Sequence, residues 1–181
     1  LPLRLLLSSQ PSRGIPIFGK FWWCPLLEST LVPLSENGFV LSTLGGKHIY
    51  LNKTKEDRIA SGDGRWTGRL LSSGEVELAS ESWEYRYARG RIAQAKRKDG
   101  PIVEWLYEGT RLRGIKDSKD GNIFPINYAA DNPIPVSIAI KGNTFDLKPQ
   151  QVPAVIQVMG QTMVSGFDHS LAEIQTAQRM W

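Results

Sequence analysis

The chain has 181 residues, of which 41% are hydrophobic and 22% charged, and its formal net charge is +4. This balance is typical of a globular domain with its own core and excludes a wholly disordered chain. No apolar run is long enough to cross a bilayer, and the single cysteine, Cys24, excludes an internal disulfide. Leu1 is not a start methionine, so we expect a fragment or a processed product.

The first eighty residues alternate between short apolar segments and turn residues, a pattern that predicts strands rather than helices. Asn37-Gly38 is a strong hairpin signal because both residues accept positive φ, and Gly45-Gly46 marks a second turn. The polar stretch 53–64 predicts an exposed loop. The predicted strands are residues 1–9, 26–34, 39–44, 47–51 and 75–78, with an apolar aromatic block at residues 15–23.

An internal repeat of about twenty residues follows. Tyr87 falls on Tyr107 and Arg91 on Arg111, and an Asp-Gly pair closes each unit. A third, weaker copy leads to Tyr128. Within each unit the aromatic residues recur at every second position, which places them on one face of a strand. Each unit therefore predicts a β-hairpin that cannot bury its apolar face without a neighbouring unit.

The repeat, Tyr-x-x-Gly-Arg-Ile at residues 87–92, resembles the YD repeat of the Rhs family, although Ala88 and Glu108 stand where that repeat has Asp. Two further blocks resemble the segments that precede such repeats, Leu-Pro-Leu-Arg-Leu at residues 1–5 and Phe-Gly-Lys-Phe-Trp at residues 18–22. The resemblance covers residues 1–128. It implies a spiral β wall, in Rhs proteins a shell around a toxin, that is secreted or held at the surface of a bacterium; a cytoplasmic location is not excluded.

The last part of the chain predicts one more hairpin, residues 136–140 with 144–147 across Gly142-Asn143. Beyond it, Leu171, Ile174 and Trp181 fall at helical spacing, and Asp168 is suited to cap the helix. The predicted fold is therefore all-β, with consecutive antiparallel β-hairpins forming a curved sheet and a short C-terminal α-helix. We expect a hairpin domain at 1–148 and a partly helical extension at 149–181.

No catalytic site is predicted. Asp168-His169-Ser170 offers an acid, a base and a nucleophile, but sequence neighbours do not form a triad, and helix capping explains Asp168 and Ser170 better. His48 is the only other histidine, so metal-ligand spacing is missing, and no cofactor motif is present. A carboxylate pair such as Glu75 with Glu77 is possible but has no support in the spacing.

We therefore expect a non-enzymatic structural and interaction module. Its partner would be another protein or the remainder of a longer Rhs-like chain, and self-association through sheet edges is possible. The alternative is a ligand-binding module for glycan or nucleic acid, built from aromatic and cationic side chains. The simpler interpretation, which we favour, is that the rings fill the core and the cations form a solvated face. The candidate binding residues are Trp83, Tyr85, Tyr87, Arg89, Arg91, Trp105, Tyr107 and Arg111.

Overall fold

The computed structural model describes residues 6–7, 17–19, 22–44, 46–54, 57–130, 132–140, 142–158 and 161–176. All regular elements in these ranges are β-strands, and the pairings between them are antiparallel, so the predicted all-β class and its hairpins are confirmed. Of the described residues, Cys24–Ile123 form one compact unit, and those before Cys24 and from Phe124 onward form a second. The part of the chain that is described contains no helix long and apolar enough to span a membrane.

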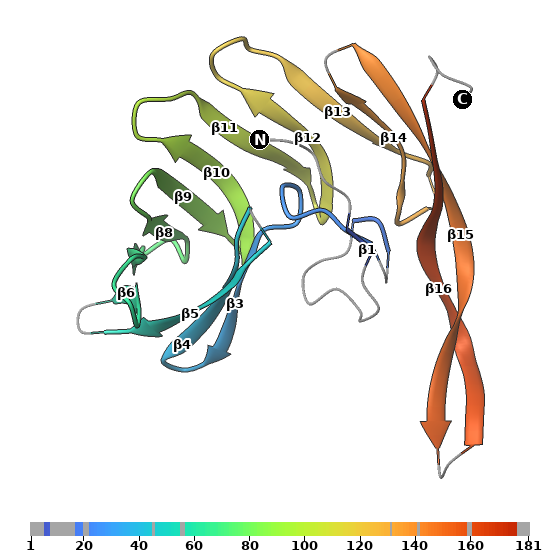
Figure 1. Ribbon diagram of the computed structural model, residues 1–181, viewed down its shortest axis with the longest axis horizontal. Coiled ribbons are helices and arrows are strands. Elements are labelled where there is room, and N and C mark those ends of the chain that lie inside the picture. Colours follow the sequence, from blue (N-terminus) through green and yellow to red (C-terminus); the bar gives the residue numbers. More distant parts are fainter. Residues whose placement is uncertain are drawn as a thin grey trace. The chain divides into compact units, whose positions relative to one another are not determined.

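In the first unit, eight successive strands form a sheet that closes into a barrel (Figure 1). The closing contact joins the start of the eighth strand to the first: Arg91 pairs with Thr30, and the Leu31 amide donates to the Gly90 carbonyl at 2.9 Å. The strands are β3 (Thr30–Ser35), β4 (Gly38–Ser42), β5 (His48–Lys53), β6 (Arg58–Ser61), β7 (Thr67–Leu70), β8 (Val76–Ala79), β9 (Trp83–Ala88) and β10 (Arg91–Arg97).

The barrel interior is filled by one alternating set of side chains. The register places Leu78 opposite Tyr85 and Tyr87 opposite Ile92, so the aromatic face of β9 points inward and the intervening charged residues point outward. Burying such apolar side chains contributes about 1.5–3 kcal/mol each. The buried side chains of this set are Leu31, Leu41, Leu51, Ile59, Val76, Leu78, Tyr85, Tyr87, Ile92 and Ala95.

Strand β10 is shared between the barrel and a further hairpin. Its first residue pairs with β3, whereas Gln94, Ala95 and Lys96 pair with β11 (Ile102–Glu108). Strand β12 (Arg111–Asp117) then pairs with β11. The predicted second repeat is therefore an antiparallel hairpin laid directly beside the first.

The second unit is described by itself. Strands β1 (Leu6–Leu7) and β2 (Trp22–Trp23) pair with each other. A four-stranded antiparallel sheet follows, ending in a long hairpin that contains two bulges. Its strands are β13 (Ile123–Tyr128), β14 (Pro135–Ile140), β15 (Asn143–Val158) and β16 (Gln161–Thr176).

The predicted C-terminal helix is wrong over the described residues, because 161–176 form β16. Asp168 pairs with Val152 and His169 with Gln151, so neither lies at a helix start. The helical spacing rested on a few apolar positions, and pairing along the whole of β15 overrides so weak a local preference. Residues 177–181 lie outside the described part. The predicted domain boundary at residue 148 falls within β15 and remains a prediction.

Two strand predictions also differ from the structure. Residues 26–29 were expected to be extended, but the amides of Leu27 and Glu28 both donate to the Cys24 carbonyl in a turn, and β3 begins at Thr30. The predicted loop 53–64 contains a strand, β6. Most of the N-terminal blocks at residues 1–5 and 18–22 lies outside the described residues.

Candidate functional site

The candidate aromatic residues of the first repeat line the barrel. Tyr85 stacks on Trp66 with ring centroids 5.3 Å apart, and on Trp83 at 6.2 Å. Tyr87 continues the row at 6.5 Å from Tyr85. Tyr85 is 9% exposed and Tyr87 is 1% exposed. These two rings are therefore core side chains of the barrel.

A buried polar chain holds Tyr87 in place. Its hydroxyl lies 2.8 Å from Ser29 Oγ, and Ser29 Oγ donates to the Ser42 carbonyl at 2.6 Å. Because the serine hydroxyl has one hydrogen, the tyrosine is the donor in the first bond. Burial raises the pKa of Tyr85 to about 12 and also raises that of Tyr87. Both phenols therefore stay neutral at physiological pH.

In the second repeat, Trp105 is buried and its Nε1 donates to the Leu26 carbonyl at 3.0 Å. Tyr107 is half-buried beneath Arg91, whose guanidinium carbon lies 5.5 Å from the ring centroid. Arg91 also donates to the Thr110 carbonyl. A cation over a ring contributes about 0.5–1 kcal/mol at a partly exposed position. Arg91 therefore connects the first hairpin to the second.

The remaining two candidates are Arg89 and Arg111. Arg89 is exposed in the turn before β10 with a φ of 52°, and Arg111 is half-buried at the start of β12. The eight residues thus comprise three buried rings, one half-buried ring, the Arg91–Tyr107 contact between the hairpins, the turn cation Arg89 and the half-buried Arg111. Their use as a ligand-binding set remains a prediction.

The structure brings a different group of side chains together on the outer face of β6–β10. Here a groove of about 670 Å³ crosses five strands. Its size lies in the range of roughly 300–1,000 Å³ that ligand sites occupy. It is lined by Thr54, Arg58, Ile59, Ala60, Thr67, Gly68, Arg69, Glu77, Leu78, Ala79, Glu84, Tyr85, Arg86, Gln94 and Lys96.

Two cross-strand rows build this groove. The first row is charged and polar, and runs through direct register partners from β6 to β10: Arg58, Arg69, Glu77, Arg86 and Gln94. The second row has small side chains in its first three strands and an acid and a base in the last two: Ala60, Thr67, Ala79, Glu84 and Lys96. The small residues leave the space, and the charged row forms one wall of it.

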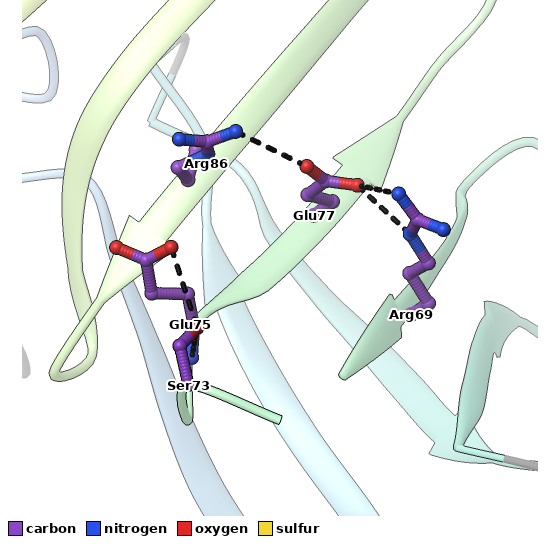
Figure 2. Close-up of polar contacts among 5 residues, drawn as sticks. All are labelled: Arg69, Ser73, Glu75, Glu77 and Arg86. Atoms are coloured by element: carbon purple, nitrogen blue, oxygen red, sulfur yellow. Dashed lines mark hydrogen bonds and ion pairs between the residues drawn. The ribbon is translucent and has the colours of Figure 1, made fainter. Parts of the chain in front are cut away.

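Glu77 sits between two arginines of the charged row, as Figure 2 shows. Its Oε2 accepts from Arg69 Nε at 2.9 Å and lies 2.8 Å from Arg69 Nη2. Its Oε1 accepts from Arg86 Nη2 at 3.3 Å. The hydrogen bond from Arg69 lowers the pKa of the Glu77 carboxyl, with a smaller contribution from Arg86. Glu75 lies just before β8 and instead accepts a hydrogen bond from Ser73 Oγ at 3.5 Å (Figure 2).

Three of the side chains considered for catalysis from the sequence, His48, Glu75 and Glu77, have described partners. His48 Nδ1 lies 3.0 Å from Ser42 Oγ at the barrel rim. Glu75 and Glu77 do not share a site with each other, since each has its own partners. Among the described residues there is no group of three or more His, Cys, Asp or Glu side chains that could hold a metal ion.

Sequence reasoning missed Arg58 and Arg69, and it considered Glu77 only as a possible carboxylate partner of Glu75. The signal for the contact of Glu77 with Arg69 and Arg86 was the alternation at residues 75–78 together with these cations on the flanking segments. Arg58 had no such signal, because the polar stretch around it predicts a loop. No protein-family model matches this chain, and no curated protein matches it.

Proposed function

We propose that this chain is a non-enzymatic structural and interaction module, a segment of an Rhs-like wall of YD-type repeats. Its role would be to present a sheet to a protein partner or to the remainder of a longer chain, at the surface of a bacterium or outside it. The observation that carries the proposal is that two successive hairpins repeat the same pairing, bulge included.

The repeated pairing is specific. In the first hairpin Tyr87 faces Ile92, and in the second Tyr107 faces Leu112. The register then skips Ala93 in the first hairpin and Arg113 in the second, twenty residues apart. A bulge at the same place in both hairpins gives both strands the same bend and twist. Units with one shape stack by one repeated contact, which is the property that a repeat wall requires.

The same cross-strand charge pair also recurs. Lys96 lies opposite Glu84 in the first hairpin, and Lys116 lies opposite Glu104 in the second. The contact of Arg91 with Tyr107 and Thr110 then joins one hairpin to the next. Both features support a repeated structural unit rather than two unrelated hairpins.

An edge strand offers the route to a partner. Within the described strands β16 pairs only with β15, so no described strand pairs with the other edge of this 16-residue strand. A long free edge is a template for one more strand, from a second protein or a second copy of this chain. The proposed partner contact is β-strand addition at β16.

Sedimentation velocity over a concentration series, with hydrogen exchange followed by mass spectrometry, tests this proposal. We expect reversible self-association and slower amide exchange along residues 161–176 as concentration rises. His169 and Ser170 are neighbours in regular register, so their amides point to opposite edges of β16. Of the two variants His169→Pro and Ser170→Pro, one should therefore lose association while keeping its stability, and the other should lose stability.

A chain that stays monomeric, with equally fast exchange along β16 at every concentration, would contradict the proposed edge contact. The alternative function, ligand binding through the candidate aromatic rings, has less support because Tyr85, Tyr87 and Trp105 are buried. The candidate cations Arg89, Arg91 and Arg111 do not line the groove on the outer face of β6–β10.

A further inference from the structure

The contacts that join the two hairpins do not use the groove on the outer face of β6–β10. Those contacts involve Arg91, Tyr107 and Thr110, and none of these residues lines the groove. Cations gathered in a concave site raise the local concentration of anions, so an anionic ligand is expected here. The lining has a formal excess of two positive charges, from the cations Arg58, Arg69, Arg86 and Lys96 and the acids Glu77 and Glu84.

The positive excess belongs to only one of the two cross-strand rows. In the second row Lys96 lies directly opposite Glu84, so the charges of this row cancel. The charged row contains three arginines and a single acid, Glu77, and its members are direct register partners from strand to strand. The whole excess therefore lies along the row that crosses β6–β9.

One end of the charged row contains an unfavourable pair. Arg58 lies directly opposite Arg69, and like charges in this position destabilise a strand pair. Arg69 is engaged by Glu77, whereas no described carboxylate lies within ion-pair distance of the Arg58 guanidinium. A local rule broken at a groove is the pattern expected of a binding site rather than of a purely structural face.

The charged row already holds one glutamate side chain. The two carboxylate oxygens of Glu77 accept from Arg69 on one neighbouring strand and from Arg86 on the other (Figure 2). Arginine forks match planar carboxylates by shape as well as by charge. An acidic side chain from another protein would extend the same arrangement at Arg58.

The length of the charged row fits the side chains of an extended peptide. With strands about 4.8 Å apart, the three strand spacings from Arg58 on β6 to Arg86 on β9 cover on the order of 14 Å. In an extended chain, side chains on one face recur at every second residue, about 6.7 Å apart. Three acidic side chains at alternate positions would therefore span about 13 Å, close to the length of the row.

We propose that this groove binds an extended acidic segment of a partner protein, with aspartate or glutamate at alternate positions. The arginines of the charged row bind its carboxylates. Ala60 and Ala79 leave room for its backbone, and Thr67 and Gln94 supply hydrogen-bond partners for its peptide groups. The proposal rests on the interaction role proposed above, but it uses neither the edge of β16 nor the eight residues considered from the sequence.

The lining favours a protein segment over a nucleic acid. Single-stranded nucleic acid binds by stacking bases on exposed rings, and the one aromatic side chain of the lining, Tyr85, is 9% exposed. Glu77 and Glu84 would also repel closely spaced phosphates. An acidic saccharide carries carboxylates without the alternating side chains of a peptide, so it serves as a competing ligand in the test.

Isothermal titration calorimetry of the full chain tests the proposal. The main probe is a capped hexapeptide that alternates glutamate and threonine, and its uncharged counterpart has glutamine in place of glutamate. The competing ligands, trigalacturonic acid and tetrathymidylate, carry the same net charge as the acidic peptide. We expect binding of the acidic peptide that weakens as salt is added, and at least about tenfold weaker binding of the three others, which corresponds to about 1.4 kcal/mol.

Single arginine variants decide whether the groove is responsible. Arg58→Gln removes a lining cation, whereas the matched control Arg97→Gln removes an exposed arginine at the end of β10 that does not line the groove. We expect at least about a tenfold loss of affinity for the acidic peptide in the first and less than about a twofold loss in the second. Arg58→Glu should weaken binding further while its urea midpoint stays equal or rises, because an opposite-charge pair with Arg69 replaces a like-charge pair.

Three results would overturn the proposal. They are equal losses of affinity in Arg58→Gln and Arg97→Gln, no binding of the acidic peptide, and binding of the saccharide or the nucleic acid as tight as that of the peptide. Arg58→Gln should leave self-association through β16 unchanged, because Arg58 lies on β6. A failure of the groove and a failure of the β16 contact are therefore distinguishable.

Discussion

The buried hydroxyl chain from Tyr87 through Ser29 to the Ser42 carbonyl is expected to stabilise the closed barrel, and its two members should contribute unequally. Ser29 lies just before β3, Ser42 at the end of β4 and Tyr87 on β9, so the chain crosses the seam where β10 meets β3. The perturbations are Tyr87→Phe, Ser29→Ala and the double variant.

The expected magnitudes follow from what each change leaves unpaired. Tyr87→Phe removes one donor while Ser29 Oγ keeps its bond to the Ser42 carbonyl, so we expect a loss of about 1 kcal/mol in the free energy of unfolding. Ser29→Ala removes that bond and also leaves the phenol hydroxyl buried without its acceptor, a loss of about 2–3 kcal/mol. In the double variant the phenol is gone as well, so its loss should fall about 1 kcal/mol short of the sum.

Urea unfolding followed by tryptophan fluorescence measures all three free energies, with equal m-values as the condition for comparing them. Tyr50→Phe is the matched control, because this tyrosine is 61% exposed and its hydroxyl does not belong to the buried hydrogen-bond network of Tyr87, Ser29 and Ser42. The control substitution should change the free energy of unfolding by less than about 0.5 kcal/mol. The reasoning is refuted if the two single losses are equal and simply add, or if Tyr87→Phe is as stable as the original chain.

Two further outcomes follow from the barrel interior. A Cβ at Gly68 would lie 2.0 Å from the Glu77 carbonyl oxygen, so Gly68→Ala should lower the free energy of unfolding by about 2 kcal/mol or more. Gly62→Ala is the control, because a Cβ there would have nothing within 4 Å. In the same urea assay it should change the free energy of unfolding by less than about 0.5 kcal/mol. Burial raises the pKa of Tyr85 from 10.0 to about 12, so the unfolded state loses this proton first, and stability should fall by about 1–2 kcal/mol as pH rises from 10 to 12. Tyr85→Phe should flatten that part of the pH profile of urea unfolding, and an unchanged slope would refute the assignment.

The hairpins were predictable because their signal is local. Alternation along residues 83–87 placed three aromatic side chains on one face, and the turn before Arg91 gave the reversal; the structure has both. The spacing of Tyr87 and Tyr107 also predicted that the two units are equivalent. The bulges at Ala93 and Arg113 were not predictable, since an unpaired residue in a strand leaves no mark on composition.

The barrel and its groove were not predictable for a different reason. Closure rests on the pairing of Arg91 with Thr30, two residues far apart in the sequence, and no periodicity reports such a contact. The groove depends in turn on β6, where Arg58 lies in a stretch too polar and too short to predict a strand. The helix predicted near the C-terminus failed similarly, because the pairing of β16 with β15 is set by the hairpin and not by the spacing of Leu171 and Ile174.

The division of β10 between two neighbours has a consequence for growth. Its first residue seals the barrel against β3, and its later residues leave that seam to pair with β11. In the proposed array the first repeat, β9–β10, is itself part of the barrel, so the next hairpin is added at β11, on the residues of β10 that lie beyond the seam. Over the residues that meet β3, the first repeat therefore has no free edge on which another molecule could add a strand.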